Sequence, residues 1–138
     1  MAYGNDWLVN GAPPFARFAI DNVAGARTHF TAPSMDDLVA ELKSAFWVSL
    51  LGPGYDATLW RSALHKAFRA AGPKKRNLVH SRLNALRRFR NRVAHHEPIF
   101  SNAMQMHTEC LEAVSWMCAD TCAWAKHHSR FPAVHAAP

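Results

Sequence analysis

The residues best suited to chemistry lie within one short segment, residues 86–99 (LRRFRNRVAHHEPI). There, Arg90 and Asn91 stand a few positions ahead of a double histidine, His95 and His96, inside a run of positive charge. Arginine binds phosphate through a planar fork of donors. Histidine has an unperturbed pKa of about 6.5, which suits proton transfer near neutral pH. Together these side chains are what a metal-free ribonuclease needs.

The positive charge of the chain is concentrated around this segment. The formal net charge is +6, and of the 16 Lys and Arg residues 11 fall between Ala57 and His96, where there is no Asp or Glu. The bland interpretation is a solvated helix face, but such faces usually carry both signs. A block of one sign favours a polyanionic partner, nucleic acid. The 11 residues are Arg61, Lys66, Arg69, Lys74, Lys75, Arg76, Arg82, Arg87, Arg88, Arg90 and Arg92.

Length and composition predict one soluble domain. A chain of 138 residues that is 49% hydrophobic can fill a core. No apolar run approaches the roughly 18 residues of a membrane span. The N-terminal sequence lacks the basic start and apolar stretch of a signal peptide. Three cysteines without a spaced framework fit a reducing compartment. We therefore expect a cytoplasmic protein.

Helical periodicity, punctuated by Gly and Pro, predicts an all-α bundle of four to five helices with no strand hairpin. The expected helices cover about residues 14–27, 34–50, 56–71, 74–94 and 102–126. Ser34 with Asp37 resembles a capping box that opens the second helix. That helix carries Leu38, Leu42, Ala45 and Ser49 on one stripe, with Val39, Phe46 and Leu50 beside it. The tail after Ser129 is expected to fray.

The helix over residues 74–94 has a charged residue on its apolar stripe. Val79, Leu83 and Leu86 predict a core-facing stripe whose next members are Arg90 and Val93. An arginine there is costly unless it is paired or reaches water. Either the helix has left the core and Arg90 extends to solvent, or Arg90 faces a cleft or interface where a phosphate will bind. The sequence leaves both open.

The geometry of an ideal helix separates some of the candidate residues. Asn91 and His95 are four apart and share a face, which Arg88 joins. Arg90 and His95 are five apart, about 140° around the helix. They would meet only if the helix unwinds near His95, or if two copies converge across a two-fold axis. His96 diverges from His95 by about 100°, and we expect it to be structural.

Metal binding is the main chemical alternative. Four potential ligands share one stripe of the expected helix over residues 102–126, namely His107, Cys110, Cys118 and Cys122. On a continuous helix His107 and Cys122 would be about 22 Å apart, too far for one zinc ion. We therefore expect no metal site and no cofactor, and interpret the cysteines as small core residues. His107 faces the core, where it either contacts the motif segment or is an ordinary buried histidine.

Residues 34–131 resemble the C-terminal part of the Abi-like (abortive infection) family of HEPN proteins. The central match is Arg90-Asn91-Arg92-Val93-Ala94-His95-His96-Glu97-Pro98-Ile99, preceded by Leu86-Arg87. Earlier matching residues are Phe46-Trp47, Leu50-Leu51, Tyr55, Leu59-Trp60, Leu64 and Phe68, and later ones are Trp116 and Arg130 before Phe131-Pro132. By this resemblance residues 34–131 are the HEPN domain, and the expected all-α bundle of four to five helices is HEPN-like. Residues 1–33 are an N-terminal segment with one helix, where the family usually has more helices, and residues 132–138 are a tail.

The resemblance implies a metal-independent endoribonuclease of defence or toxin type that acts as a homodimer. Its signature arginine and histidine would be Arg90 and His95, with Asn91 between them. His95 would exchange protons with the ribose 2′-hydroxyl or the leaving oxygen, and Arg90 would stabilise charge on the phosphate. Arg87, Arg88 and Arg92 would bind the RNA backbone, while His96 and His107 would support the site. A toxin-type enzyme also implies an antitoxin or regulator protein as partner.

Two further hypotheses compete with this activity. The first is a catalytically silent HEPN domain that binds nucleic acid or a protein partner, which the same basic block would serve. The second is a purely structural helical module, which requires the Arg90 and His95 side chains to be buried and internally paired. An active site requires both side chains to be accessible and to converge, within one chain or across a dimer.

Overall fold

A computed structural model describes residues 17–137, and these residues form helices and turns with no strand, as the sequence predicted. In chain order the helices are α2 (Arg17–Arg27), α3 (Met35–Glu41), α4 (Ser44–Ser49), η1 (Pro53–Tyr55), η2 (Asp56–Trp60), η3 (Leu64–Phe68), α5 (Arg76–Ala94), α6 (Phe100–Met117), α7 (Ala119–His128) and α8 (Phe131–Ala136). The expected helix start near residue 14 lies outside the described residues. Within residues 17–137 no helix is long and apolar enough to span a bilayer.

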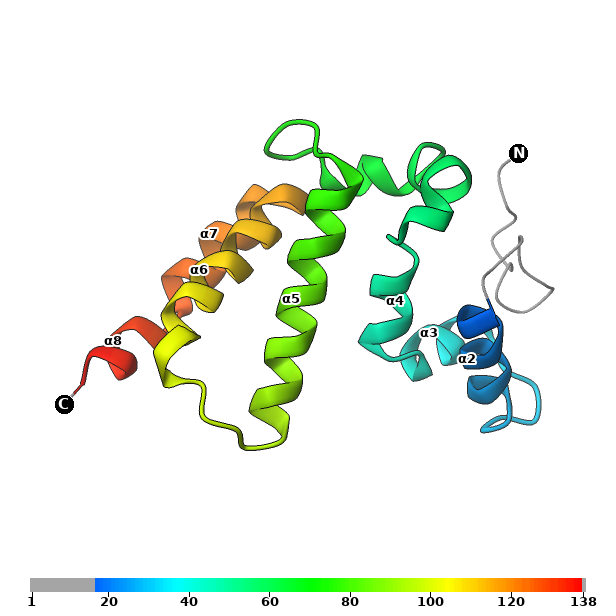
Figure 1. Ribbon diagram of the computed structural model, residues 1–138, viewed down its shortest axis with the longest axis horizontal. Helices are drawn as coiled ribbons and strands as arrows, with labels where there is room; N and C mark the ends of the chain where they lie inside the picture. The colour runs from blue at the N-terminus through cyan, green and yellow to red at the C-terminus, as the bar shows by residue number, and fades with distance from the viewer. Residues whose placement is uncertain (1–16, 138) are drawn as a thin grey trace.

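Helix α5 is the central element, with α2 to α4 on one side of it and α6 to α8 on the other (Figure 1). Two clusters of buried residues hold the helices together. The first joins α2, α3 and α4 and contains Ala19, Val23, Ala26, Leu38, Leu42, Phe46, Leu50 and Tyr55. The second joins η2, η3, α5 and α6 and contains Leu51, Trp60, Phe68, Val79, Ala113 and Trp116. Leu64 packs against both clusters.

The single helix expected over residues 34–50 is instead two helices, α3 and α4. The Ser34–Asp37 capping box that opens α3 is confirmed. The chain becomes extended at Leu42 and Lys43, and the indole Nε1 of Trp47 donates to the Leu42 carbonyl at 3.1 Å. That hydrogen bond satisfies a carbonyl that the break leaves without a helical partner. Leu42 remains buried across the break, whereas Val39 is exposed.

The segment expected as a helix over residues 56–71 is irregular. One π-helical stretch, η2, and one 3₁₀ helix, η3, replace the regular helix, although Trp60 and Phe68 still enter the core and stack at 5.9 Å. Arg76 holds this segment against α5, since its guanidinium donates to Asp56 at 3.1 Å and to the Leu51 carbonyl at 2.7 Å.

The helix expected over residues 102–126 reverses at Cys118. Cys118 ends α6 and opens α7 with extended backbone angles, and α7 packs back along α6. The tail after Ser129 does not fray as expected but forms α8, which packs against α6. In α8 the Phe131 ring stacks on His107 at 4.9 Å, and the His135 ring stacks on Phe100 at 4.4 Å.

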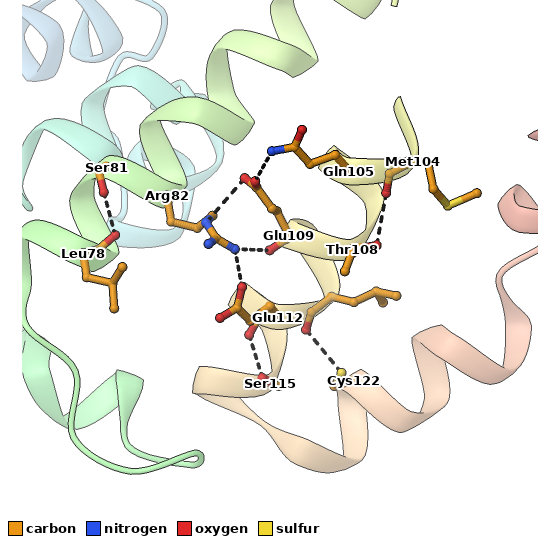
Figure 2. Close-up of polar contacts among 11 residues, drawn as sticks. Leu78, Ser81, Arg82, Met104, Gln105, Thr108, Glu109, Glu112, Ser115 and Cys122 are labelled. Carbon is orange, nitrogen blue, oxygen red and sulfur yellow. Dashed lines mark hydrogen bonds and ion pairs between the residues drawn. The ribbon is translucent and has the colours of Figure 1, made fainter. Parts of the chain in front are cut away.

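Arg82 locks α5 to α6. Its guanidinium contacts the carboxylates of Glu109, at 3.4 Å, and Glu112 (Figure 2). It also lies 5.5 Å from the centre of the Trp116 ring. The Arg82 side chain is only 19% exposed, so water solvates its charge poorly. The two carboxylates compensate that charge instead. The contact fixes the upper part of α5, and the helix continues from there to the motif.

Candidate functional site

The motif arginines lie on the last turns of α5, and the other elements of residues 17–137 cover these turns only in part. Burial decreases along the core-facing stripe: Val79 is fully buried, Leu83 and Leu86 are half-buried, Arg90 is exposed, and Val93 is 45% exposed. Helices α5 and α6 pack at the end held by Arg82 and diverge toward the turn that joins α5 to α6 (Figure 1). Arg90 is therefore on the core-facing side of its helix but beyond the core.

The double histidine forms the C-terminal cap of α5. His95 is the capping residue, and the next residue, His96, has a left-handed backbone with φ of 56°. The His96 N–H donates to the Val93 carbonyl at 3.1 Å, and the Glu97 N–H donates to the Arg92 carbonyl at 3.0 Å. This pair of bonds is the Schellman motif, in which glycine usually holds the left-handed position. The expectation that His96 is structural agrees with this geometry.

Arg92 fastens the turn that follows the cap. Its Nε lies 3.1 Å from Glu97 Oε2, and its Nη2 donates to the Pro98 carbonyl at 2.5 Å. Arg92 is a residue of α5, and its guanidinium binds the two residues that lie five and six positions later, Glu97 and Pro98. The resemblance implies that Arg92 binds RNA. In the structure its guanidinium stabilises the turn that follows α5.

The side chain of Asn91 is bonded to Arg90, whose Nη1 donates to Asn91 Oδ1 at 3.4 Å. The bond from the His95 N–H to the Asn91 carbonyl, at 2.9 Å, is the ordinary backbone bond of the α-helix. Both Arg90 and His95 are exposed, so the purely structural module, which needs them buried, lacks its condition. No direct contact between Arg90 and His95 is found among the described residues. Since α5 stays helical through Ala94, the two side chains leave the helix in different directions, as ideal geometry predicted.

The basic block is less uniform in space than in sequence. Four of its arginines form ion pairs with acidic residues from outside the block. Arg61 and Arg76 pair with Asp56, Arg82 pairs with Glu109 and Glu112, and Arg92 pairs with Glu97. Arg87 is half-buried and donates to Asn84 Oδ1 at 3.0 Å. Within residues 17–137 no ion pair involves Arg88 or Arg90, and both are exposed. These two guanidiniums are the ones near the motif best placed to meet a phosphate.

The described partners of His107 are on the C-terminal segment. Its Nε2 is 2.8 Å from Ser129 Oγ, and its ring stacks on Phe131. It lines a groove of about 500 Å³, together with Cys122 and Lys126, between α6, α7 and α8. Of the two possibilities left open by the sequence, these contacts fit a histidine that packs against its neighbours, and they include no motif residue.

The continuous helix expected over residues 102–126, which would have kept His107 and Cys122 about 22 Å apart, is not present. The reversal at Cys118 brings Cys122 back to α6, where its Sγ donates to the Leu111 carbonyl at 3.2 Å (Figure 2). In residues 17–137 no group of three or more His, Cys, Asp or Glu side chains is arranged to hold a metal ion. Of the three cysteines expected in the core, Cys122 is buried, Cys118 is half-buried and Cys110 is exposed. Hydrogen bonds from Thr121 lower the pKa of the Cys118 thiol.

Two features near the motif were missed in the sequence. Glu97 is the partner of Arg92, and Phe100, the first residue of α6, is 71% exposed with one ring face against His135. The signal for the first was the five-residue spacing from Arg92 to Glu97 across the proline-containing turn. There was no sequence signal for the second, because it depends on how α8 packs.

Comparison with known proteins adds no assignment. No protein-family model matches the chain, and searches of curated proteins and of solved structures give no significant match. The function is therefore inferred from the residues and their geometry.

Proposed function

We propose that this chain is a metal-independent endoribonuclease of the HEPN type, belonging with the Abi-like proteins and active as a homodimer. One observation carries the proposal: Arg90 and His95 are both exposed, at the end of a helix whose core-facing stripe has run beyond the core. A charged residue at a core-facing position, left accessible, is better suited to a ligand or partner than to packing.

The proposed reaction is transesterification at a ribose. An imidazole of His95 accepts the 2′-hydroxyl proton while the 2′-oxygen bonds to phosphorus and the bond to the 5′-oxygen breaks. An acid then protonates the 5′-oxygen, and the products are a 2′,3′-cyclic phosphate and a 5′-hydroxyl. The guanidinium of Arg90 stabilises the negative charge on the phosphate in the transition state. Because the nucleophile is the 2′-hydroxyl, RNA is cleaved and DNA is not.

A second copy of the chain supplies what one copy lacks. In a single chain Arg90 and His95 leave α5 in different directions. With His96 assigned to the helix cap, His95 alone would have to serve two proton transfers. If two α5 helices meet at their uncovered ends, Val93 from each copy becomes buried and the two motifs share one cleft. The second His95 would then act as the acid. We expect light scattering at micromolar concentration to give twice the chain mass of 15.4 kDa; a mass equal to one chain would count against this arrangement.

The silent binding domain is the second candidate, and one observation favours it: Arg90 is turned toward Asn91 rather than toward His95. Such a domain would bind RNA through Arg88 and Arg90 without cleaving it.

Cleavage assays separate the two candidates. Purified wild-type protein, His95→Ala and His96→Gly would be incubated with mixed RNA in EDTA. We expect the His95→Ala variant to lose about 10²- to 10⁴-fold in rate, and His96→Gly, which keeps the left-handed cap, to stay near wild type. Products should carry 2′,3′-cyclic phosphates, and RNA with a 2′-deoxy sugar at the cut should be inert. Full activity in His95→Ala would overturn the mechanism, and an RNA-binding wild-type protein that cleaves nothing would establish the silent domain.

A further inference from the structure

From the ring geometry at the start of α6 we infer that Phe100, backed by His135, is a stacking platform for an unpaired RNA base next to the cleavage site. The inference rests on the proposed RNA function and adds the single-stranded form of the substrate. Phe100 begins α6 immediately after the turn that carries His95 to Ile99.

The Phe100 ring is open on one side and supported on the other. The side chain is 71% exposed, more than any other exposed large hydrophobic residue of residues 17–137. The imidazole of His135 lies parallel to it, with centroids 4.4 Å apart and planes 7° apart. His135 Nε2 also lies 3.3 Å from the Phe100 carbonyl and, facing an acceptor, donates to it. One face of the Phe100 ring is therefore stacked on His135 of α8, and the other face is exposed to solvent, where a ligand can stack on it.

A nucleobase is the planar group that this surface fits. Proteins that bind single-stranded nucleic acid stack successive bases on aromatic side chains and hold the backbone with basic residues. The exposed guanidiniums of Arg88 and Arg90, which form no ion pair within residues 17–137, lie on the last two turns of α5. At most about 18 Å of chain separates His95 from Phe100. A base on Phe100 would thus belong to the same strand whose phosphate lies at the motif, within a few nucleotides of it.

Arg92 makes the platform part of the motif turn. Through its hydrogen bond to the Pro98 carbonyl it holds the backbone two residues before Phe100. The turn is therefore fixed at both ends, by the cap of α5 on one side and by α8 on the other. A platform fixed relative to His95 can position a base, whereas an aromatic residue on a mobile loop cannot.

Trp124 provides a matched control. It is also an aromatic residue and 65% exposed, but it lies on α7, where its ring is tilted 47° against His128. The experiment measures binding of fluorescein-labelled single-stranded RNA, of the same sequence as a blunt duplex, and of an abasic ribose-phosphate chain of equal length. The parent protein is His95→Ala, which prevents cleavage. The substitutions Phe100→Leu, Phe100→Trp and Trp124→Leu are each introduced into this parent.

We expect Phe100→Leu to weaken binding of single-stranded RNA about 5- to 100-fold, the loss that corresponds to one base stack. It should leave binding of the duplex and of the abasic chain unchanged, and Phe100→Trp and Trp124→Leu should bind like the parent. Irradiation of the parent complex with ultraviolet light should crosslink RNA to Phe100, as located by mass spectrometry; this measurement does not depend on a substitution at Phe100.

The outcomes distinguish the inference from the function on which it rests. If the parent binds no RNA, the proposed function fails. If it binds single-stranded RNA but Phe100→Leu binds equally well and no crosslink maps to Phe100, the platform is wrong and the nuclease proposal stands. If Phe100→Leu instead changes the mass of the protein in light scattering, the ring lies between copies of the chain and the platform is again overturned.

Discussion

The guanidinium of Arg92 and the carboxylate of Glu97 lie 3.1 Å apart across the turn that ends α5. The two side chains are 40% and 49% exposed, so solvent screens their attraction. The same guanidinium also donates to the Pro98 carbonyl. The geometry thus combines a weak ion pair with a hydrogen bond to the backbone, and the two contributions can be measured separately.

We predict that Glu97→Gln costs less than about 1 kcal/mol of unfolding free energy, because exposed ion pairs contribute about 0–1 kcal/mol. Arg92→Ala should cost more, since it also removes the bond to Pro98. A double-mutant cycle by urea unfolding gives the coupling between the two residues. The coupling should shrink in high salt; a coupling that is independent of salt would contradict an ion pair.

His96 is predicted to be a site where glycine stabilises the protein. A non-glycine residue in the left-handed region costs about 1–2 kcal/mol, part of which glycine loses again through the entropy of the unfolded chain. His96→Gly should therefore raise stability by up to about 1 kcal/mol, seen as a higher melting temperature. His96→Val should lower it, because a β-branched residue is least compatible with positive φ. His95→Gly is the matched control and should not stabilise.

Arg82→Ala is predicted to be among the most damaging single changes on α5. It leaves the carboxylates of Glu109 and Glu112 without the cation they share and removes the cation–π contact with Trp116. We expect a loss of about 2 kcal/mol or more in urea unfolding. Arg82→Lys should recover only part of it, because an ammonium lacks the planar fork that reaches both carboxylates. Ser81→Ala, one residue away and exposed, should change little.

The capping box of α3 predicts a pH effect at Asp37. Hydrogen bonds from the Ser34 hydroxyl, at 2.7 Å, and from the Ser34 N–H, at 2.9 Å, hold the pKa of Asp37 below its usual value. A depressed native pKa adds stability that is present above the unfolded value of about 3.9 and is lost as the pH falls through the native value. Ser34→Ala should raise the pKa of Asp37 in an NMR titration and destabilise more at pH 7 than in acid. Ser44→Ala, at a helix start without a side-chain cap, should not shift the pKa of Asp37.

Binding of RNA is predicted to weaken steeply with salt, because each phosphate neutralised releases counterions. Arg88→Ala and Arg90→Ala should each reduce the slope of log affinity against log salt by about 1. Arg17→Ala, on the exposed face of α2, is the matched control and should leave the slope unchanged. His95→Ala should not alter affinity. An affinity insensitive to salt would show that these arginines do not bind the backbone.

The sequence by itself determined the helical class, the extent of α5 and the capping box of α3. The apolar period of α5 and the Gly72-Pro73 stop before it are local signals, and its start at Arg76 and end at Ala94 follow closely from them. The capping box depends on residues three positions apart, so it forms wherever Ser34 begins a helix. The motif residues could be singled out in the same way, since their types and spacing are local.

The breaks at Leu42 and Cys118 were decided by tertiary structure. Neither site carries glycine or proline, and an uninterrupted helix would satisfy the local hydrogen bonds equally well. At Leu42 the break is compensated by the hydrogen bond from Trp47. The reversal at Cys118 lets Cys122 pack against α6 and lets His107 contact Ser129 and Phe131 of the C-terminal segment. Such compensation comes from side chains brought together only when the helices pack, and helical periodicity does not encode it.

Tertiary structure also decided which basic residues remain available. In sequence the block from Ala57 to His96 contains no acid, yet folding brings Asp56, Glu109 and Glu112 onto it and leaves Arg88 and Arg90 exposed. Likewise, the sequence left open whether Arg90 reaches solvent or faces a cleft, because the answer depends on where α5 passes the edge of its neighbours. Local patterns fix which residues share a helix face, whereas only packing determines how far along the helix that face is covered.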